Sequence, residues 1–451
     1  MKFIFSILLI LLGLEVSAVD YCSIKGQVHE NATKKVDLFK TVEGKPVLCS
    51  SSVVAADGSY GFLFKPESSG FYAIGDLNNN YLIYVESGDE VNIDLYKDKA
   101  QLTGKNTIKN QTLYLWKDYA AEVSFKSLNY YKSCSIFEDF FPAYEKFLTG
   151  FSKIRRQLKS GDAAFDTELQ ILVEYEKDYF ATLFLQTPRL KHPEPSQIAD
   201  FYKDIVSDKK YTDETVLSHP WGISMLASYA LFAANQSGKK FANIDERTDE
   251  CLNYINNSRL KGEFILNSHL VYIKNYPHYA YCVERYGKYI TTASQKERAD
   301  KLGSKLFVAK DGNLAADFTY PDINGKEVSL SDFRGKVVLL DVWATWCGPC
   351  KAQIPHLIKL EKEMKDKGLV VIGVSVNEAK DKQKWMDFVK KEGLGGVQVF
   401  ANGWSKITKD YKIKCIPRFM VFDKKGHIVS MNAPRPSDPQ LKALLEAELN
   451  K

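Results

Sequence analysis

The stretch Trp343-Ala344-Thr345-Trp346-Cys347-Gly348-Pro349-Cys350 decides the fold of the C-terminal part of this 451-residue chain. It ends an almost continuous apolar run, residues 336–343, which predicts a strand buried on both faces of a sheet. A helical pattern follows over residues 351–360. Two cysteines therefore lie where a strand passes into a helix. The positive end of a helix dipole favours the thiolate, which is the form of cysteine that attacks disulfides.

The order of the two cysteines predicts their roles. Cys347 stands first, at the helix end, so we expect it to be exposed and to attack the substrate disulfide. Cys350 lies one turn further on, and we expect it to be more buried and to resolve the mixed disulfide. Asp341, on the strand beneath, is the candidate base, because an apolar environment raises the pKa of a carboxyl group. The alternatives are a permanent structural disulfide and a carboxylate whose hydrogen bonds are satisfied at the strand end.

These residues resemble the thioredoxin superfamily. The string Trp-Cys-Gly-Pro-Cys-Lys at 346–351 is the thioredoxin active-site sequence, Asp341 matches the family's buried acid, and Pro355 matches the proline that bends the active-site helix. Residues 414–419, Lys-Cys-Ile-Pro-Arg-Phe, match the cis-proline loop, which implies a cis bond beside the cysteines. The resemblance implies that the substrate contacts Trp346, Gly348, Pro349, the backbone of Ile416, and Pro417.

Flanking segments narrow the resemblance to TlpA-like, exported thioredoxins. Residues 316–336 predict a hairpin and a short turn, and residues 369–376 and 379–391 predict an additional strand and helix. Two positions depart from the pattern. Gln353 stands where many cytochrome-maturation members carry a glutamate, which argues against that dedicated role. Arg418 stands where thioredoxins commonly have threonine, and a positive charge there favours acidic partners or a nearby thiolate.

The N-terminus predicts export. Lys2, an apolar stretch from Phe3 to Leu14 and the small residues near Ala18 form a signal-peptide pattern over residues 1–18. An uncleaved anchor and a lipid attached to Cys22 remain alternatives. The resemblance places TlpA-like proteins in the periplasm. A net charge of +5, without a dense basic block, argues against nucleic-acid binding.

The eight cysteines fit an oxidising compartment but contain only one closely spaced pair. No second Cys or His pair offers the spacing of a metal site, so we expect no metal. The sequence leaves open whether Cys22 pairs with Cys49 and Cys251 with Cys282, or whether these are buried free thiols. Cys415, two residues before Pro417, is an inert thiol, a regulatory thiol or a point of intermolecular linkage.

The remaining pattern divides the chain into four segments. We expect a signal peptide at 1–18, a small antiparallel β-sandwich domain at 19–106, an all-α domain at 107–305 and an α/β thioredoxin-fold domain at 306–451. Apolar runs at 81–85 and 91–95 predict strands. Phe165, Leu169 and Leu172 predict one face of a helix that Gly161-Asp162 caps.

Together these features predict an exported thiol-disulfide oxidoreductase that reduces disulfides in proteins. The chain lacks a Gly-x-Gly-x-x-Gly fingerprint, so we expect no cofactor. A partner must then supply the electrons, and the resemblance implies a membrane protein. Two alternatives remain. The first is the same chemistry run as a disulfide oxidase or isomerase, and the second is a ligand-binding or chaperone-like protein whose first two domains hold the ligand and whose redox site is secondary.

Overall fold

The computed structural model describes residues 20–30, 33–76, 79–128 and 133–451, so the predicted signal peptide lies outside the described residues. The chain forms two compact units. The first contains the described residues up to His269 together with Tyr289–Thr292, and the second contains Leu270–Lys288 and Ala293–Lys451. Within the described ranges, no helix combines the length and the apolar character needed to cross a membrane.

The first unit opens with two four-stranded sheets, ordered β4-β1-β7-β8 and β3-β2-β5-β6. The predicted strands at 81–85 and 91–95 are confirmed as β6 and β7, although each joins a different sheet. The strands of this unit are β1 (Cys22–Gln27), β2 (Lys35–Val42), β3 (Lys45–Val53), β4 (Ser59–Phe64), β5 (Gly70–Gly75), β6 (Asn80–Val85), β7 (Glu90–Leu95) and β8 (Ala100–Leu102).

One strand pair corrects the expectation of purely antiparallel sheets. Strands β1 and β7 run parallel, with Ile24 opposite Val91, whereas β1 and β4 run antiparallel. Alternation of apolar residues reports which face of a strand is buried, but it does not report strand direction. Parallel neighbours need a long connection, and here strands β2 to β6 lie between β1 and β7 in the chain.

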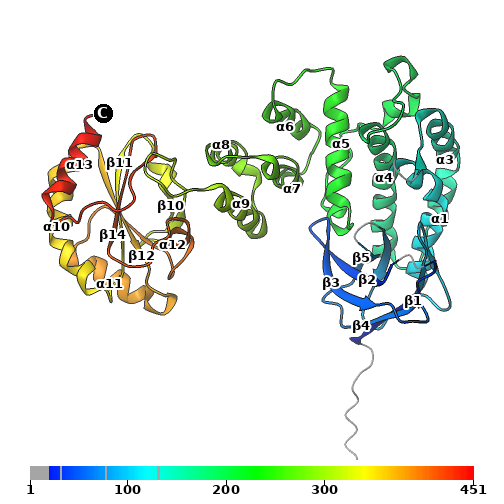
Figure 1. Cartoon of the computed structure of the whole chain (residues 1–451), viewed down its shortest axis with the longest axis horizontal. Coiled ribbons are helices and arrows are strands. Elements are labelled where there is room, and N and C mark those ends of the chain that lie inside the picture. Colours follow the sequence, from blue (N-terminus) through cyan, green and yellow to red (C-terminus); the bar gives the residue numbers. More distant parts are fainter. Residues whose placement is uncertain (1–19, 31–32, 77–78, 129–132) are drawn as a thin grey trace, which may run out of the picture. The chain divides into compact units, whose positions relative to one another are not determined.

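Helices complete the first unit, and Figure 1 shows α1, α4 and α5 reaching the sheets and α3 beside α1. The predicted cap and helix are confirmed: Asp162 accepts hydrogen bonds from the amides of Ala164 and Phe165, both at 3.0 Å, and α4 begins at Ala163. The helices are α1 (Ile108–Leu128), α3 (Phe137–Gln157), α4 (Ala163–Gln186), α5 (Gly222–Gln236), α6 (Ile244–Asn253) and α7 (Ser258–Ser268).

The second unit contains a five-stranded sheet of order β13-β12-β11-β14-β15 (Figure 1). Strand β11 pairs in parallel with β12 and antiparallel with β14, as in a thioredoxin-like sheet. The strands are β9 (Thr319–Pro321), β10 (Glu327–Ser329), β11 (Val337–Trp343), β12 (Leu369–Ser375), β13 (Val397–Phe400), β14 (Arg418–Phe422) and β15 (Ile428–Ser430). The helices are α8 (Tyr276–Tyr286), α9 (Ala293–Leu306), α10 (Gly348–Met364), α11 (Lys382–Glu392), α12 (Lys406–Asp410) and α13 (Pro439–Leu449).

Strand β11 is buried along its whole length, as its apolar run predicts. Its side chains alternate between the two faces of the sheet. Leu340 and Val342 pack with residues of α11 and α12, whereas Val337 and Leu339 pack with residues of α10 and α13. Asp341 shares the parity of Val337 and Leu339, so it belongs to the face that α10 covers.

Candidate active site

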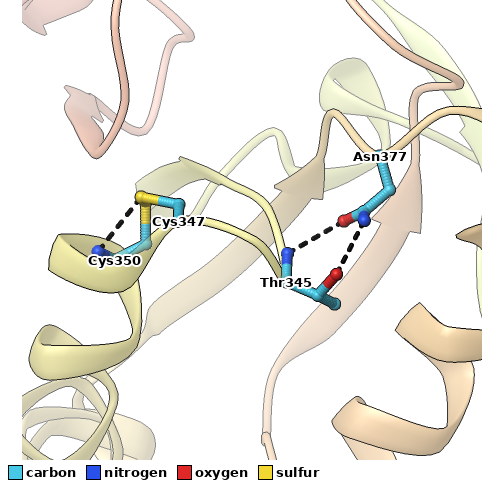
Figure 2. The surroundings of a disulfide bond; sticks show 4 residues. All are labelled: Thr345, Cys347, Cys350 and Asn377. Carbon is cyan, nitrogen blue, oxygen red and sulfur yellow. Dashed lines mark hydrogen bonds between the residues drawn. A yellow bond between two sulfur atoms is a disulfide. The ribbon is translucent and has the colours of Figure 1, made fainter.

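Cys347 and Cys350 form a disulfide at the junction of β11 and α10. The turn is closed by a hydrogen bond from the Cys347 amide to the carbonyl of Ala344 at 3.0 Å. The amide of Cys350 donates to the Cys347 sulfur at 3.2 Å, and Figure 2 shows this contact. A donor at the start of a helix stabilises negative charge, so this position favours a Cys347 thiolate once the disulfide is reduced.

The exposure of Cys347 differs from the sequence-based expectation. Cys347 is only 4% exposed in the disulfide form, almost as little as Cys350 at 2%. Cys347 belongs to the buried hydrophobic cluster that also contains Val342 and Ala344, and its sulfur is bonded to that of Cys350. The solvent-facing residues of the motif are instead Trp346, Gly348 and Pro349.

Asp341 is a fully buried carboxyl group beneath the active-site helix. Its Oδ1 atom has no hydrogen-bond partner among the described residues. Burial alone raises the pKa of Asp341 from 3.8 to about 8. In the disulfide form this side chain is therefore mostly neutral at pH 7, and it can take up or release a proton close to the pH at which thiols ionise.

The Ile416–Pro417 peptide bond is cis, as the loop pattern predicts. Strand β14 begins at the next residue, and Arg418 lies opposite Val342 of β11. This pairing brings the cis-proline loop to the edge of the sheet where β11 ends and the disulfide begins. Ile416 and Pro417 are half-buried there, and Cys415 is an exposed free thiol.

Gln353 and Arg418, the two residues that depart from the family pattern, each form a hydrogen bond with another segment. Gln353 accepts a hydrogen bond from the Ser437 amide at 3.1 Å, which ties the active-site helix to the segment before α13. Arg418 donates to Asn432 at 2.9 Å, on the segment after β15.

Near the disulfide lies a second set of polar residues that the sequence did not predict as part of the site. Asn377 Oδ1 accepts hydrogen bonds from the Thr345 amide at 3.0 Å and the Ser375 hydroxyl at 2.9 Å. Its Nδ2 atom donates to the Thr345 hydroxyl at 2.7 Å (Figure 2). The available signal was an asparagine directly after the apolar run of β12, because polar residues that follow parallel strands gather at one edge of a sheet.

The structure answers whether the remaining cysteines form the two additional disulfides that the sequence allows. Cys22 and Cys49 are free thiols, and so is Cys251, so neither suggested second disulfide is present. Cys22 points into the core from β1 with no exposed surface, and burial raises the pKa of its thiol to about 12. A lipid on that sulfur would not fit this packing.

Comparison with known proteins gives a consistent result for the second unit. The AhpC/TSA family model matches residues 312–431. Thiol-disulfide oxidoreductase ResA of Bacillus anthracis is 31% identical over 135 residues, which are 30% of this chain and 76% of ResA. The thioredoxin-like protein YneN of Bacillus subtilis (strain 168) is 30% identical over 149 residues, covering 31% of this chain and 81% of YneN.

A crystal structure of the thioredoxin domain of a thiol-disulfide oxidoreductase from Bacteroides vulgatus is 28% identical. It covers 32% of this chain and all of that domain, with a TM-score of 0.28 over the whole chain. The similarity to ResA identifies the family of this chain, because the matched region spans more than two thirds of ResA. This chain belongs to the thioredoxin-like AhpC/TSA family and is a thiol-disulfide oxidoreductase.

Proposed function

We propose that the protein is exported to the periplasm and reduces disulfides of other proteins with the Cys347–Cys350 dithiol. The observation that carries this proposal is the Cys350 amide on the Cys347 sulfur at the start of α10. That donor and the helix dipole both favour the thiolate needed for attack.

The thiol–disulfide exchange proceeds in two steps through a mixed disulfide. The Cys347 thiolate attacks one sulfur of the substrate disulfide, so a Cys347–substrate bond forms and the other substrate sulfur leaves as a thiolate. Cys350 then attacks the Cys347 sulfur, forms the disulfide seen here and releases the second substrate thiol. The substrate gains two electrons and the enzyme loses two.

Asp341 is the proton acceptor for Cys350 in this proposal. A pKa of about 8 lies close to that of a cysteine thiol, so the proton moves between the two groups at little cost in free energy. Trp346, Gly348 and Pro349 supply exposed surface to the substrate, and Ile416 and Pro417 lie at the same sheet edge. We assign substrate contact to these five residues.

The reducing direction requires an electron source outside the chain. The sequence lacks a dinucleotide-binding fingerprint, so a membrane-bound donor protein would reduce the Cys347–Cys350 disulfide. In this proposal the chain consists of a signal peptide (1–18), a β-sandwich domain (19–106), an all-α domain (107–305) and a thioredoxin-fold domain (306–451). Mass-spectrometric mapping of the mature N-terminus in the periplasmic fraction tests export.

The reduction potential of the Cys347–Cys350 pair tests the direction. We would equilibrate the purified protein in defined thiol buffers and measure the fraction of dithiol. A value near roughly −270 mV supports a reductase, whereas a value of about −120 to −180 mV would overturn it in favour of an oxidase or isomerase.

Trapping tests the two cysteine roles. Cys350→Ser leaves the attacking sulfur but removes the resolving one, so this variant accumulates mixed disulfides with its substrates. Cys347→Ser should accumulate none, and Cys415→Ser is the matched control that leaves both active-site sulfurs in place. Equal trapping by Cys347→Ser would refute the assigned order.

A second candidate function, ligand binding, is favoured by a cavity in the first unit. It measures about 490 Å³ and is lined by residues that include Tyr81, Lys117, Glu176, Tyr179 and Trp221. This volume lies within the range of small-molecule sites. Retention of the cellular role by Cys347→Ser would favour this binding function over catalysis, and loss of the role would exclude it as the main function.

A further inference from the structure

Two tryptophans project into solvent at the edge of the sheet that carries the disulfide. Trp346 is 55% exposed and Trp404 is 44% exposed, so both present a large apolar area to solvent. Trp346 follows β11 and Trp404 follows β13. Strands β11, β12 and β13 are adjacent and parallel, so the loops that follow them lie at one edge.

Asn377, in the loop after the middle strand β12, joins the two tryptophan loops. On one side its side chain bonds the amide and the hydroxyl of Thr345, the residue before Trp346. On the other side its main-chain carbonyl accepts a hydrogen bond at 2.8 Å from the amide of Gly403, the residue directly before Trp404. Figure 2 shows the first of these contacts, with the Asn377 amide facing Thr345.

This connection is buried and therefore rigid. Asn377 and Ser375 have no exposed surface, and Thr345 is nearly covered. Buried polar groups that lose their partners destabilise a structure strongly, so the three residues hold one arrangement. Gly403 adopts a φ of +85°, a conformation that suits glycine and lets its amide reach Asn377.

The spacing of the two tryptophans selects the kind of partner. Neighbouring strands lie about 4.8 Å apart, so the loops after β11 and β13 are separated by roughly 10 Å. An extended polypeptide spans that distance with about three residues, at roughly 3.3 Å per residue. A small disulfide that reaches the Cys347 sulfur contacts only the neighbouring Trp346.

We propose that Trp346 and Trp404 form a docking surface for an extended polypeptide segment beside the disulfide being exchanged, with Asn377 as its positioning residue. This inference deepens the proposed function and rests on it, because it names Trp404 as the residue that favours polypeptide disulfides over small ones. The two indoles contact apolar side chains that flank the substrate cysteine, and Asn377 keeps their loops in register.

Kinetics with two substrates test the docking surface. We would compare kcat/KM for insulin, a disulfide-linked polypeptide, with kcat/KM for 2-hydroxyethyl disulfide, which is too short to reach Trp404. Trp404→Ala should lower the ratio of these two values about tenfold, mainly through KM for insulin, as expected for loss of one aromatic contact. Tyr281→Ala, which removes another exposed aromatic of the same unit, should leave the ratio within about twofold.

Asn377 variants test the positioning role. Asn377→Leu removes the side-chain hydrogen bonds that anchor the loop after β12, whose main-chain carbonyl holds Gly403 beside Trp404. Loosening of that loop should lower the ratio about as much as Trp404→Ala. Asn377→Asp keeps the acceptors for Thr345 and Ser375 and should restore it. Adding Asn377→Leu to Trp404→Ala should lower the ratio no further, since both act on the same contact.

The outcomes separate this inference from the proposed function. An unchanged ratio in Trp404→Ala, or equal losses for both substrates, overturns the docking surface while the exchange chemistry stands. Failure of the unmodified protein to exchange with either substrate overturns the proposed function itself. If Asn377→Leu does not fold, the Trp404→Ala and Asn377→Asp measurements still decide the question.

Discussion

The two units each bury a carboxyl group, and they do so in opposite ways. Glu176 of α4 and Asp341 of β11 are 4% and 5% exposed, so burial does not distinguish them. Glu176 receives hydrogen bonds from Trp116, Lys117 and His219. Asp341 has one oxygen without any partner among the described residues.

The number of donors sets the charge of each group. Burial alone would raise the pKa of Glu176, but Lys117 and His219 hold that pKa well below its usual value. Burial without donors leaves the pKa of Asp341 at about 8. The first carboxylate stays ionised and connects α1 to α4. The second titrates near neutral pH, which suits proton transfer rather than structural support.

The largest expected effect is a gain in stability from Asp341→Asn. The pKa of Asp341 is about 8 in the folded state against an ordinary value of 3.8, so the folded state binds more protons between these pH values. Its stability therefore falls as pH rises through that window. Removing the carboxyl group should raise the unfolding free energy by on the order of 4 kcal/mol at pH 7, with almost no gain below about pH 4.

Hydrogen exchange of β11 amides at acidic and at mildly basic pH, about 4 and about 8, measures this gain for the second unit alone. Amides of α4 provide the internal control, because the substitution would not alter the first unit. A gain that is equal at both pH values would contradict the raised pKa.

The next effect is a loss of stability when Glu176 is deprived of its cation. Lys117→Met should lower the local unfolding free energy of α4 by about 3 kcal/mol, because a buried charge is left poorly compensated. His219 accepts a bond from the Trp221 amide at 3.1 Å through Nδ1, so Nε2 faces Glu176. Burial lowers the pKa of His219, and Lys117 lowers it further.

Without Lys117 the pKa of His219 should rise, so the loss of stability should shrink as pH is lowered toward about 5. The control is the double variant Lys117→Met with Glu176→Gln, which removes both charges and should recover most of the stability. Hydrogen exchange of α4 follows both variants. If the double variant is no more stable than Lys117→Met, the ion pair does not explain the loss.

Local sequence patterns predicted the positions of several helices and strands. Strand direction and the partners of buried polar groups depend on contacts between residues far apart in the chain. The apolar run of β11, the Gly-Pro turn into α10 and the Asp162 cap are each coded within a few residues, and these elements form where expected. The direction of β1 against β7 depends on strands between them. The Glu176 partners His219 and Trp116 lie 43 and 60 residues away in the chain, and Asn377 lies 32 residues from Thr345, so no local pattern links them.

The burial of Cys347 shows a second limit of prediction from sequence. The motif predicts which residues react, but the exposure of the Cys347 sulfur depends on how the disulfide packs into the hydrophobic core. A spacing pattern in sequence carries no information on that packing.

The kinetic consequence of the unpaired Asp341 should be smaller than its effect on stability. In Asp341→Asn, Cys350 has no buried proton acceptor, so the mixed disulfide should resolve about a hundredfold more slowly at pH 7. The difference should narrow at higher pH, where hydroxide takes the Cys350 proton in place of Asp341. Rapid-quench measurement of the mixed disulfide follows this step directly, and a defect that is independent of pH would argue against proton transfer.

The smallest effect is expected from a third buried carboxyl group that has fewer hydrogen-bond donors than Glu176 but more than Asp341. Gln353→Glu puts a carboxylate on α10, where the Ser437 amide supplies one donor. Burial should raise the pKa of the new carboxyl group above its ordinary value, but the single donor should keep that pKa below that of Asp341. Relative to the unmodified protein, in which Asp341 already makes stability depend on pH, the unfolding free energy of α10 should then fall by about 1 kcal/mol more between roughly pH 4 and pH 8, as measured by hydrogen exchange. Gln353→Met, which removes the hydrogen bond without adding charge, should show no such pH dependence. A carboxyl group at this position that titrates above Asp341 would mean that donor number does not set the order of these buried acids.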